Sequence, residues 1–359
     1  MSTVYNFNAG PAMLPPAVLE QVQAELRDYQ GRGMSIMEMS HRSKEFEAIN
    51  DQAEATFMRL LGLKEGYRVL FLQGGASTQF AMVPMNFLSP GATADYLMTG
   101  AWAEKAYEEA AALGQARIAA STKEEGYNRV PRVDEIHLSP EPAYVHLTSN
   151  ETIQGIQWQA FPDVGPRPLV ADMSSDILSY PFDAGKFSLI YAGAQKNLGP
   201  AGVTVVLLRE RWLEKAARNL PTMLRYATHV KSHSLYNTPP VFAVYVLNLV
   251  LQWIEKTGGL PAMADRNARK ARFIYEAIDG SNGFYRGHAA PESRSRMNIT
   301  FRLPSEALEK QFVQEAQAAG MLGLAGHRSV GGIRASIYNA MGPEGCQALA
   351  SFMKAFARK

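Results

Sequence analysis

The 359-residue chain has little cysteine, little net charge and no long apolar stretch. Its single cysteine, Cys346, excludes an internal disulfide, which is typical of a reducing compartment. A formal net charge of +2, without a block of like charges, argues against nucleic acid as a partner. The most apolar long stretch, residues 240–254, contains Asn248 and Gln252 and is too short to span a bilayer. The N-terminus lacks a basic segment followed by an apolar one, so we expect a cytoplasmic protein that does not bind membranes.

Apolar residues make up 47% of the chain and charged residues 19%, which is enough for a large packed core. Short apolar runs bounded by turn residues alternate with helical patterns, and this order predicts a mostly parallel sheet covered on both faces. The seven predicted strands are residues 69–73, 94–98, 117–120, 144–148, 169–172, 189–191 and 203–208. The predicted helices of this part begin near residue 16 and span residues 46–61, 79–88, 104–113, 241–256 and 262–278.

The pattern changes after the helix at residues 262–278, where two predicted strands (297–301, 332–337) and two predicted helices (305–319, 343–357) follow, and the second lobe is expected to begin near Gly258. The length also favours two lobes over one core. We therefore expect an α/β protein: a large domain over residues 16–257 with a mostly parallel seven-stranded sheet, and a smaller α+β C-terminal domain over residues 258–359. Residues 1–15 form an N-terminal segment that is expected to pack with the small domain.

One lysine stands in the tight link between the last two strands of the large domain. Residues 188–208 place Lys196 among small residues, with no acid nearby in the sequence to pair with it. Such a lysine is either a surface residue or an amine held where the carbonyl carbon of a ligand can reach it, which makes it a Schiff-base lysine.

A glycine-rich turn follows the first strand of the sheet. Residues 74–78 read Gly-Gly-Ala-Ser-Thr and lead into a helix, so free backbone N–H groups, the helix dipole and hydroxyl groups meet at one point. This arrangement is typical of a phosphate cradle, and the alternative is an ordinary strand–helix turn. No Gly-Lys-Ser/Thr ending is present, so the turn is not a nucleotide P-loop.

Three other polar or aromatic residues follow predicted strands. Asp172 could hold a pyridinium N–H or cap the next turn. Trp102 could stack on a flat cofactor ring or belong to the core, and Thr152 could bond a ring substituent or cap the next segment. Because the carboxyl ends of parallel strands share one edge of the sheet, we expect these residues to converge with Lys196 and the cradle.

The order of these motifs resembles the pyridoxal-phosphate enzymes of the class V aminotransferase group. The motifs are Gly-Gly-x-x-x-Gln from residue 74, Trp102, Asn-Glu-Thr from residue 150, Ala-Asp-x-Ser-Ser from residue 171 and Tyr-Ala-Gly-Ala-Gln-Lys-Asn from residue 191. Matches also occur at residues 6–15, 40–42, 237–240, 295–298 and 326–340, so the resemblance covers essentially the whole chain. It implies the fold-type I architecture and pyridoxal 5′-phosphate (PLP) as cofactor.

The resemblance also implies a role for each matching residue. Lys196 is the expected covalent attachment point and proton carrier, and Asp172 is the expected partner of the pyridine nitrogen. The other expected cofactor contacts are Trp102 on the ring, Thr152 near the ring hydroxyl, and Ala76, Ser77 and Gln195 near the phosphate, together with Asn237 and Thr238 of a neighbouring subunit. The last two imply a homodimer with shared active sites.

A set of basic residues matches the anion-binding positions of the group, and guanidinium forks suit the carboxylate and the phosphate of a substrate. The set comprises His41, Arg42, His327, Arg328 and Arg334, each of which could otherwise make a surface ion pair. Residues 76–78 depart from the Gly-Arg-Gly of many members, so one phosphate-side cation is missing. No metal site is expected.

The resemblance is closer to members that transfer an amino group between L-glutamate and 3-phosphohydroxypyruvate, giving O-phospho-L-serine and 2-oxoglutarate in serine biosynthesis. A second use in vitamin B6 biosynthesis, forming 4-phosphohydroxy-threonine, is also expected of such members. The alternatives are another class V aminotransferase of the serine–glyoxylate or alanine type, and a non-catalytic phosphate-binding protein. A cysteine desulfurase is disfavoured because Cys346 falls within a predicted helix far from the motifs.

Overall fold

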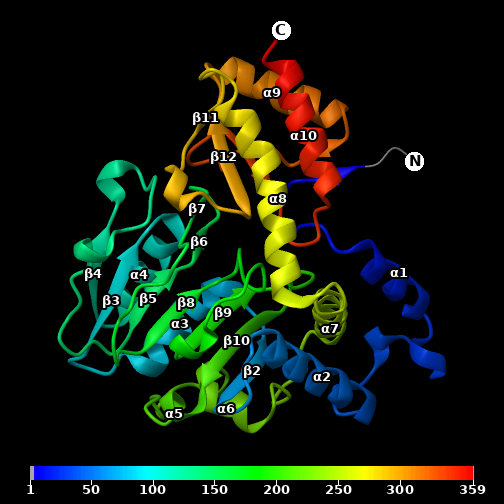
Figure 1. Cartoon of the computed structure of the whole chain (residues 1–359). Coiled ribbons are helices and arrows are strands. Elements are labelled where there is room, and N and C mark those ends of the chain that lie inside the picture. The colour runs from blue at the N-terminus through cyan, green and yellow to red at the C-terminus, as the bar shows by residue number, and fades with distance from the viewer. Residues whose placement is uncertain (1–3, 359) are drawn as a thin grey trace.

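The computed structural model describes residues 4–358, and its largest sheet has seven strands (Figure 1). Each strand overlaps one of the seven predicted runs, and the α/β prediction is confirmed. Six neighbouring pairs build the sheet, and all are parallel except the two made by β10, which runs antiparallel to β2 and β9. The spatial order is β2 (Tyr67–Leu72), β10 (Thr204–Arg209), β9 (Leu189–Gly193), β8 (Leu169–Asp172), β5 (Val145–Thr148), β3 (Thr93–Met98) and β4 (Gln115–Ser121).

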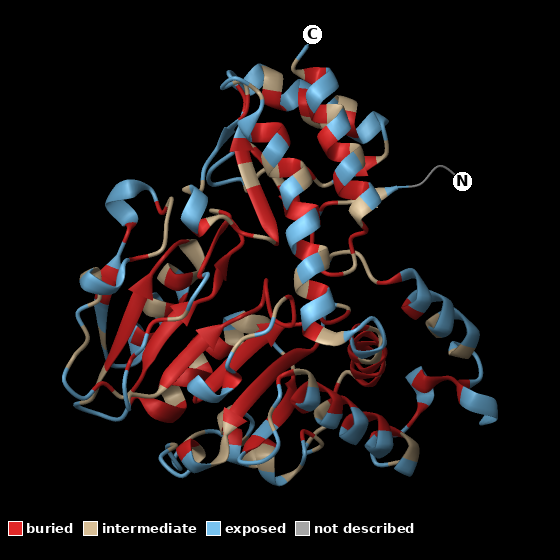
Figure 2. Ribbon diagram, viewed as in Figure 1, coloured by how far each residue is buried: buried red, intermediate tan, exposed pale blue. Residues whose placement is uncertain are grey.

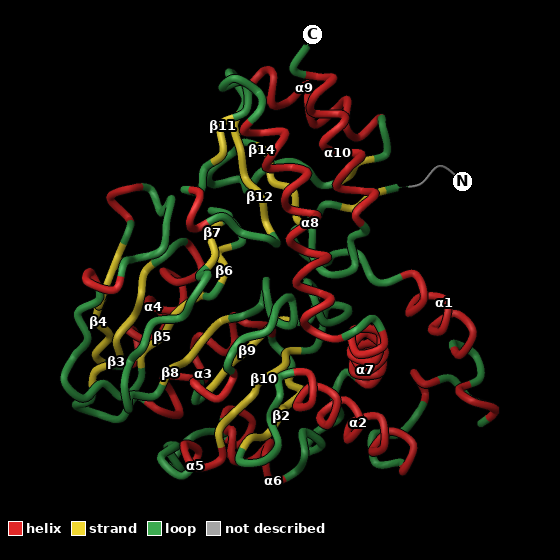
Figure 3. The backbone as a smooth tube through the Cα atoms, in the orientation of Figure 1, coloured by secondary structure: helices red, strands yellow, loops and turns green. Residues whose placement is uncertain are grey.

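Both faces of this sheet are covered by helices, and its central strands are buried on both sides (Figures 2 and 3). Side chains alternate between two apolar cores along β2: Leu70 and Leu72 belong to one, and Val69 and Phe71 to the other. The first core also holds side chains of α3 (Gly75–Phe87), α4 (Ala101–Leu113), α5 (Glu210–Leu213) and α6 (Tyr226–Lys231). The second holds side chains of α2 (Lys44–Leu60) and α7 (Val241–Lys256), and α7 is buried on nearly all sides.

A third apolar core lies in the C-terminal part of the chain. It packs a three-stranded antiparallel sheet of β11 (Arg286–Gly287), β12 (Asn298–Arg302) and β14 (Ile333–Ser336) against α9 (Glu306–Ala318) and α10 (Pro343–Phe356). The long helix α8 (Gly259–Asp279) runs between the two parts, with Leu260 in a core of the large sheet and Ile274 in this one. Near the N-terminus, β1 (Tyr5–Asn6) pairs in parallel with β13 (Met321–Leu322), and Phe7 enters the third core.

Several elements begin earlier than predicted at the carboxyl edge of the large sheet. Helix α3 starts at Gly75 instead of residue 79, because Gly74 adopts a φ of +93° and turns the chain directly from strand to helix. Helix α4 likewise starts at Ala101 instead of residue 104. A buried hairpin of β6 (Asn150–Glu151) and β7 (Ile156–Gln157) was not predicted, since two-residue strands are too short to show a periodicity.

Helix α1 (Pro16–Glu25) begins at the predicted proline and projects with the following segment away from the body of the chain (Figure 1). None of the helices between residues 4 and 358 is both long and apolar enough to cross a lipid bilayer. Residues 1–3 of the predicted N-terminal segment and residue 359 lie outside the described residues.

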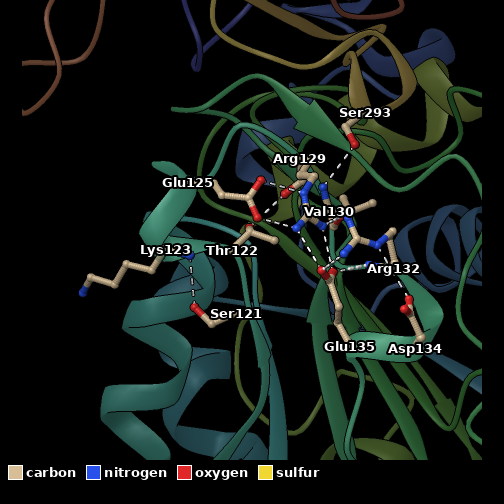
Figure 4. Close-up of polar contacts among 10 residues, drawn as sticks. All are labelled: Ser121, Thr122, Lys123, Glu125, Arg129, Val130, Arg132, Asp134, Glu135 and Ser293. Atoms are coloured by element: carbon tan, nitrogen blue, oxygen red, sulfur yellow. Dashed lines mark hydrogen bonds and ion pairs between the residues drawn. The ribbon is translucent and has the colours of Figure 1, made fainter.

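The segment after β4 links the two parts of the chain (Figure 4). Arg129 pairs with both Glu125 and Glu135, and its Nη1 lies 2.8 Å from Glu135 Oε2. Next to it, the Val130 N–H donates to Ser293 Oγ at 3.1 Å, on the way into the C-terminal sheet. The ion pairs therefore lie within this loop, and the hydrogen bond from Val130 to Ser293 joins the loop to the C-terminal part.

Candidate active site

A cavity of about 300 Å³ opens at the carboxyl edge of the large sheet, where the sequence places its candidate residues. Its lining joins the ends of β2, β3, β5, β8 and β9 to the C-terminal part of the chain. The structure brings together these predicted residues in the lining: Ala76, Ser77, Trp102, Thr152, Asp172, Gln195, Lys196, His327 and Arg334. The convergence expected from the parallel strands is therefore observed.

Lys196 lies in the turn after β9 and presents its amine to this cavity. Its Nζ donates to Thr152 Oγ1 at 2.7 Å. The next residue, Asn197, anchors the turn, because its side chain donates to Ser175 O at 3.2 Å and accepts from the Asn339 N–H at 3.0 Å. Burial lowers the pKa of Lys196 to about 8 despite the opposing charge of Asp172. About one tenth of the amine is therefore neutral, and nucleophilic, at pH 7, far more than for an ordinary lysine.

The N-terminal segment packs directly against the lysine turn. A side chain at Gly10 would place its Cβ 3.3 Å from Cγ of both Gln195 and Lys196, and the residue has a φ of +138°. The Ala12 N–H also donates to Gln195 O at 3.0 Å. Glycine at position 10 therefore lets the segment close one side of the cavity, a contact that the sequence alone did not indicate.

Asp172 is the last residue of β8 and only 4% of its surface is exposed. One carboxylate oxygen accepts from the Ser174 N–H at 2.8 Å, so the capping alternative is realised while the carboxylate also lines the cavity. Burial raises the pKa of Asp172, and the hydrogen bonds from Ser174 and the charge of Lys196 act in the opposite direction. Asp172 is thus a buried carboxylate that lines the same cavity as the Lys196 amine and interacts with its charge.

The indole of Trp102 forms a wall of the cavity from the first turn of α4. The Lys196 Nζ lies 5.7 Å from the centre of the ring. The backbone N–H of Trp102 is fixed by the Glu151 carboxylate at 3.1 Å. A flat ligand that reaches the lysine therefore has an aromatic face available beside it.

The first turn of α3 supplies the predicted cradle. Gly75, Ala76 and Ser77 line the cavity, and Gly74 at the N-cap offers no side chain to satisfy the free N–H groups of the turn. Free N–H groups and the positive end of the helix dipole favour an anion at this point.

The C-terminal part of the chain contributes Arg334 of β14 to the lining of the cavity. Its Nε is buried without a hydrogen-bond partner, and no carboxylate pairs with its guanidinium among residues 4–358. Burial lowers the pKa of Arg334, and burial together with Arg334 lowers the pKa of the nearby His327. A half-buried guanidinium with a buried, unpartnered Nε and no acid paired with it among residues 4–358 is suited to an anionic ligand.

The unsatisfied polar atoms of the cavity test whether PLP fits these residues. Besides Arg334 Nε, the buried Trp102 Nε1 and Thr148 Oγ1 have no partner within the described part of the chain. Together with an amine, a carboxylate, an aromatic wall and an anion cradle, they match an aldehyde-bearing aromatic phosphate. No group of His, Cys, Asp or Glu side chains suited to a metal ion occurs between residues 4 and 358.

Sequence reasoning assigned no role to two residues of the Asn-Glu-Thr motif that hold the surroundings of this cavity in place. Asn150 bridges the two parts of the chain, since its amide donates to Ser175 Oγ and to Asn298 Oδ1, both at 2.8 Å. Glu151 is fully buried beside Trp102. The signal available for both was their position next to Thr152, directly after a buried strand.

Five predicted residues are not in the lining of this cavity, namely His41, Arg42, Asn237, Thr238 and Arg328. Thr238 is exposed, and its carbonyl accepts from Gln73 Nε2 at 3.2 Å, next to the cradle. His41 is buried and Arg42 is exposed on the segment after α1. Arg328 lines a separate cavity beside α9. Within one chain these residues therefore do not complete the site, and their roles stay predictions.

Comparison with known proteins agrees with this geometry. The family model for aminotransferase class-V matches residues 4–349. The chain is 65% identical to the phosphoserine aminotransferase of Herpetosiphon aurantiacus over 99% of both chains. The solved structure of phosphoserine aminotransferase from Bacillus circulans subsp. alkalophilus superposes with a TM-score of 0.98 at 59% identity, covering 99% of each chain.

A PLP-bound phosphoserine aminotransferase from Trichomonas vaginalis is 41% identical, with a TM-score of 0.92 over 98% of this chain and 100% of that one. The fold of this chain is thus the fold-type I architecture over its full length. A matched family model, a buried amine in a cavity whose lining suits PLP, and relatives that are similar from end to end agree: the chain belongs to the class V aminotransferase family.

Proposed function

We propose that this chain is a PLP-dependent transaminase that moves an amino group between L-glutamate and 3-phosphohydroxypyruvate, giving O-phospho-L-serine and 2-oxoglutarate. The observation that carries the proposal is the Lys196 amine, 2.7 Å from Thr152 Oγ1, in a cavity walled by Trp102 and Asp172. The substrates are proposed from the relatives, which are named phosphoserine aminotransferases and are similar to this chain over 99% of its length.

The cofactor-binding roles are proposed from the contacts of each residue. PLP, when bound, supplies an electron-withdrawing ring next to the α-carbon of the substrate. Lys196 would hold the cofactor aldehyde, and its amine, whose pKa is lowered, would carry the proton at the α-carbon of the substrate. Asp172 would hold a protonated ring nitrogen, Trp102 would offer its aromatic face to the ring, and Thr152 orients the lysine amine.

The phosphate end is proposed to lie at the first turn of α3. Ala76, Ser77 and Gln195 line this end of the cavity. The neutral turn provides N–H groups instead of the missing arginine, and the helix dipole adds to their effect. Arg334, in the lining of the same cavity, suits the α-carboxylate of either substrate, because its guanidinium pairs with no acid among the described residues.

We also propose a homodimer in which the partner subunit completes each site. The projecting segment around α1 exposes large apolar side chains, among them Leu19 (49% exposed) and Met37 (58%). Tyr236, next to the expected contacts Asn237 and Thr238, is 49% exposed as well. Apolar surface of this kind is typical of an interface. His41, Arg42, His327 and Arg328 are the proposed phosphate-binding residues of the shared site.

The division into residues 1–15, 16–257 and 258–359 is likewise a proposal, supported by separate apolar cores on either side of α8. A location in the cytoplasm and a second activity in vitamin B6 biosynthesis stay predictions.

A coupled assay tests the proposed reaction. Purified protein loaded with PLP is given L-glutamate with either 3-phosphohydroxypyruvate or pyruvate, and 2-oxoglutarate is measured. We expect turnover with the phosphorylated keto acid to exceed turnover with pyruvate by at least about 100-fold, because charge-assisted contacts to the phosphate are lost with pyruvate. Equal rates would instead favour the serine–glyoxylate or alanine type, and the absence of turnover with both would contradict transamination of these substrates.

A further inference from the structure

Glu151 is a fully buried carboxylate that belongs to none of the roles assigned above. It lies on β6 with 0% of its surface exposed. Its Oε2 accepts from the Trp102 N–H at 3.1 Å, and its Oε1 accepts from the Ala103 N–H at 3.0 Å. The hydroxyl of Thr99 adds a longer contact at 3.5 Å. Both carboxylate oxygens of Glu151, on β6, therefore accept hydrogen bonds from the first turn of α4.

These contacts replace a missing cap on α4. Gly100 at the N-cap has no side chain to bind the free N–H groups of the first turn, and Glu151 binds two of them from the neighbouring hairpin. A Cβ at position 100 would lie 2.6 Å from Glu151 Cδ, so the glycine leaves room for the carboxylate. The negative charge also meets the positive end of the helix dipole.

The same hairpin holds the acceptor of the lysine amine. Thr152 follows Glu151 directly, and its Oγ1 lies 2.7 Å from Lys196 Nζ. The backbone of β6 thus ties the aromatic wall at Trp102 to the hydroxyl at Lys196. A shift of the Glu151 carboxylate would therefore move Trp102 and the Thr152 hydroxyl together.

We propose that Glu151 is a positioning residue of the active site: its carboxylate locks the start of α4 to the β6–β7 hairpin, fixes the Trp102 ring relative to the Lys196 amine, and adds a second negative charge beside that amine. The inference rests on the proposed PLP-dependent function.

The titratable groups that face this carboxylate come from three neighbouring parts of the chain. Asp172 at the end of β8 repels it, and Lys196 after β9 attracts it. Tyr127 faces it from the loop after β4. Burial raises the pKa of Glu151 to about 7, while the two backbone N–H donors and Lys196 favour the charged form. In return, the Glu151 charge raises the pKa of Lys196, so its removal must lower that pKa.

The experiment compares Glu151→Gln with the wild type and with Glu109→Gln, which changes an exposed acid on α4. Two quantities are measured: the PLP concentration that half-saturates the cofactor-free protein, and the pH midpoint of the absorbance change of PLP bound to Lys196. Glutamine keeps one acceptor but turns a donor toward the second N–H. We expect a roughly tenfold or greater rise in the half-saturating PLP concentration and a midpoint at lower pH, with neither change in the control.

A shorter variant separates charge from position. Glu151→Asp keeps the charge but withdraws the oxygens from α4, so PLP binding should weaken while the pH midpoint stays within about 0.3 of the wild type. This variant also serves if Glu151→Gln does not fold. An Asp variant that binds PLP like the wild type, or a folded Gln variant with an unchanged midpoint, would overturn the inference. Failure of the wild type itself to bind PLP would instead contradict the proposed function.

Discussion

Replacing Thr152 with valine should lower the pKa of Lys196 by about 1 to 2 units. Valine keeps the shape of threonine and removes the hydroxyl that accepts from Lys196 Nζ at 2.7 Å. Thr152 is only 3% exposed, so water does not readily replace the lost acceptor. A hydrogen bond to a charged group contributes about 1.5–3 kcal/mol, and one pKa unit corresponds to about 1.4 kcal/mol.

The sign follows from which form of the amine loses more. In a buried site the ammonium form depends on a hydrogen-bond acceptor more strongly than the neutral amine does. Loss of the Thr152 hydroxyl therefore destabilises the ammonium more, and the pKa of Lys196 falls. Starting from a pKa of about 8, the variant should have a value of about 6 to 7.

The assay uses cofactor-free protein and an amine-acylating reagent, which reacts only with the neutral form. The fraction of Lys196 acylated in a fixed time is measured by peptide mass spectrometry across the pH range from about 5 to 9. Thr148→Val is the matched control, because its buried hydroxyl lines the same cavity and has no partner among residues 4–358. A midpoint for Thr152→Val that equals the wild type, rises, or moves no further than that of the control would refute the reasoning.

Three further predictions concern the charges around the site and one buried lysine. Asp172→Asn should also lower the Lys196 midpoint in the same acylation assay, because it removes the charge that supports the ammonium; an upward shift would contradict this. Arg334→Gln should raise KM for glutamate about 100-fold with a smaller effect on kcat in steady-state kinetics, and a change in kcat alone would count against a role in binding. Burial lowers the pKa of Lys270 from 10.5 to about 7, so the unfolded chain binds the extra proton between these values. The free energy of unfolding of the wild type, relative to Lys270→Met, should therefore rise by up to about 5 kcal/mol from pH 7 to pH 10.5 in urea titrations, whereas a constant difference would exclude a neutral buried amine.

The apolar runs alone predicted the seven strands of the large sheet, because strands buried on both faces carry continuous apolar residues. They could not predict strand order or the antiparallel direction of β10, which depend on pairing between distant segments. The helices that begin at Gly75 and Ala101 were predicted to begin three or four residues further along the chain, because small residues in a first turn give no periodic signal. The hairpin at residues 150–157 was missed because its two-residue strands are too short to show a periodicity.

Within the site, the residues that directly follow strands could be predicted, whereas the residues that hold them in position could not. Lys196, Asp172, Trp102 and Thr152 converge because parallel strands end at one edge. Glu151 was overlooked because its role depends on Gly100, 51 positions earlier in the chain, and only the folded backbone brings the two together.

A second group of residues was assigned from the family resemblance alone, and the single chain does not test it. Arg42 and Thr238 are exposed, and Arg328 lines another cavity. The resemblance assigns Thr238 to the site of a neighbouring subunit and the two arginines to anion binding, and these roles stay predictions.

The most direct test of the central claim is to locate the covalent attachment of PLP. Protein incubated with PLP is reduced with borohydride, digested and mapped by mass spectrometry, with Lys196→Arg as the comparison. We expect a stoichiometric pyridoxyl label on the peptide that contains Lys196, and no such label on the variant. A label confined to other lysines, or a protein that takes up no PLP, would contradict the account.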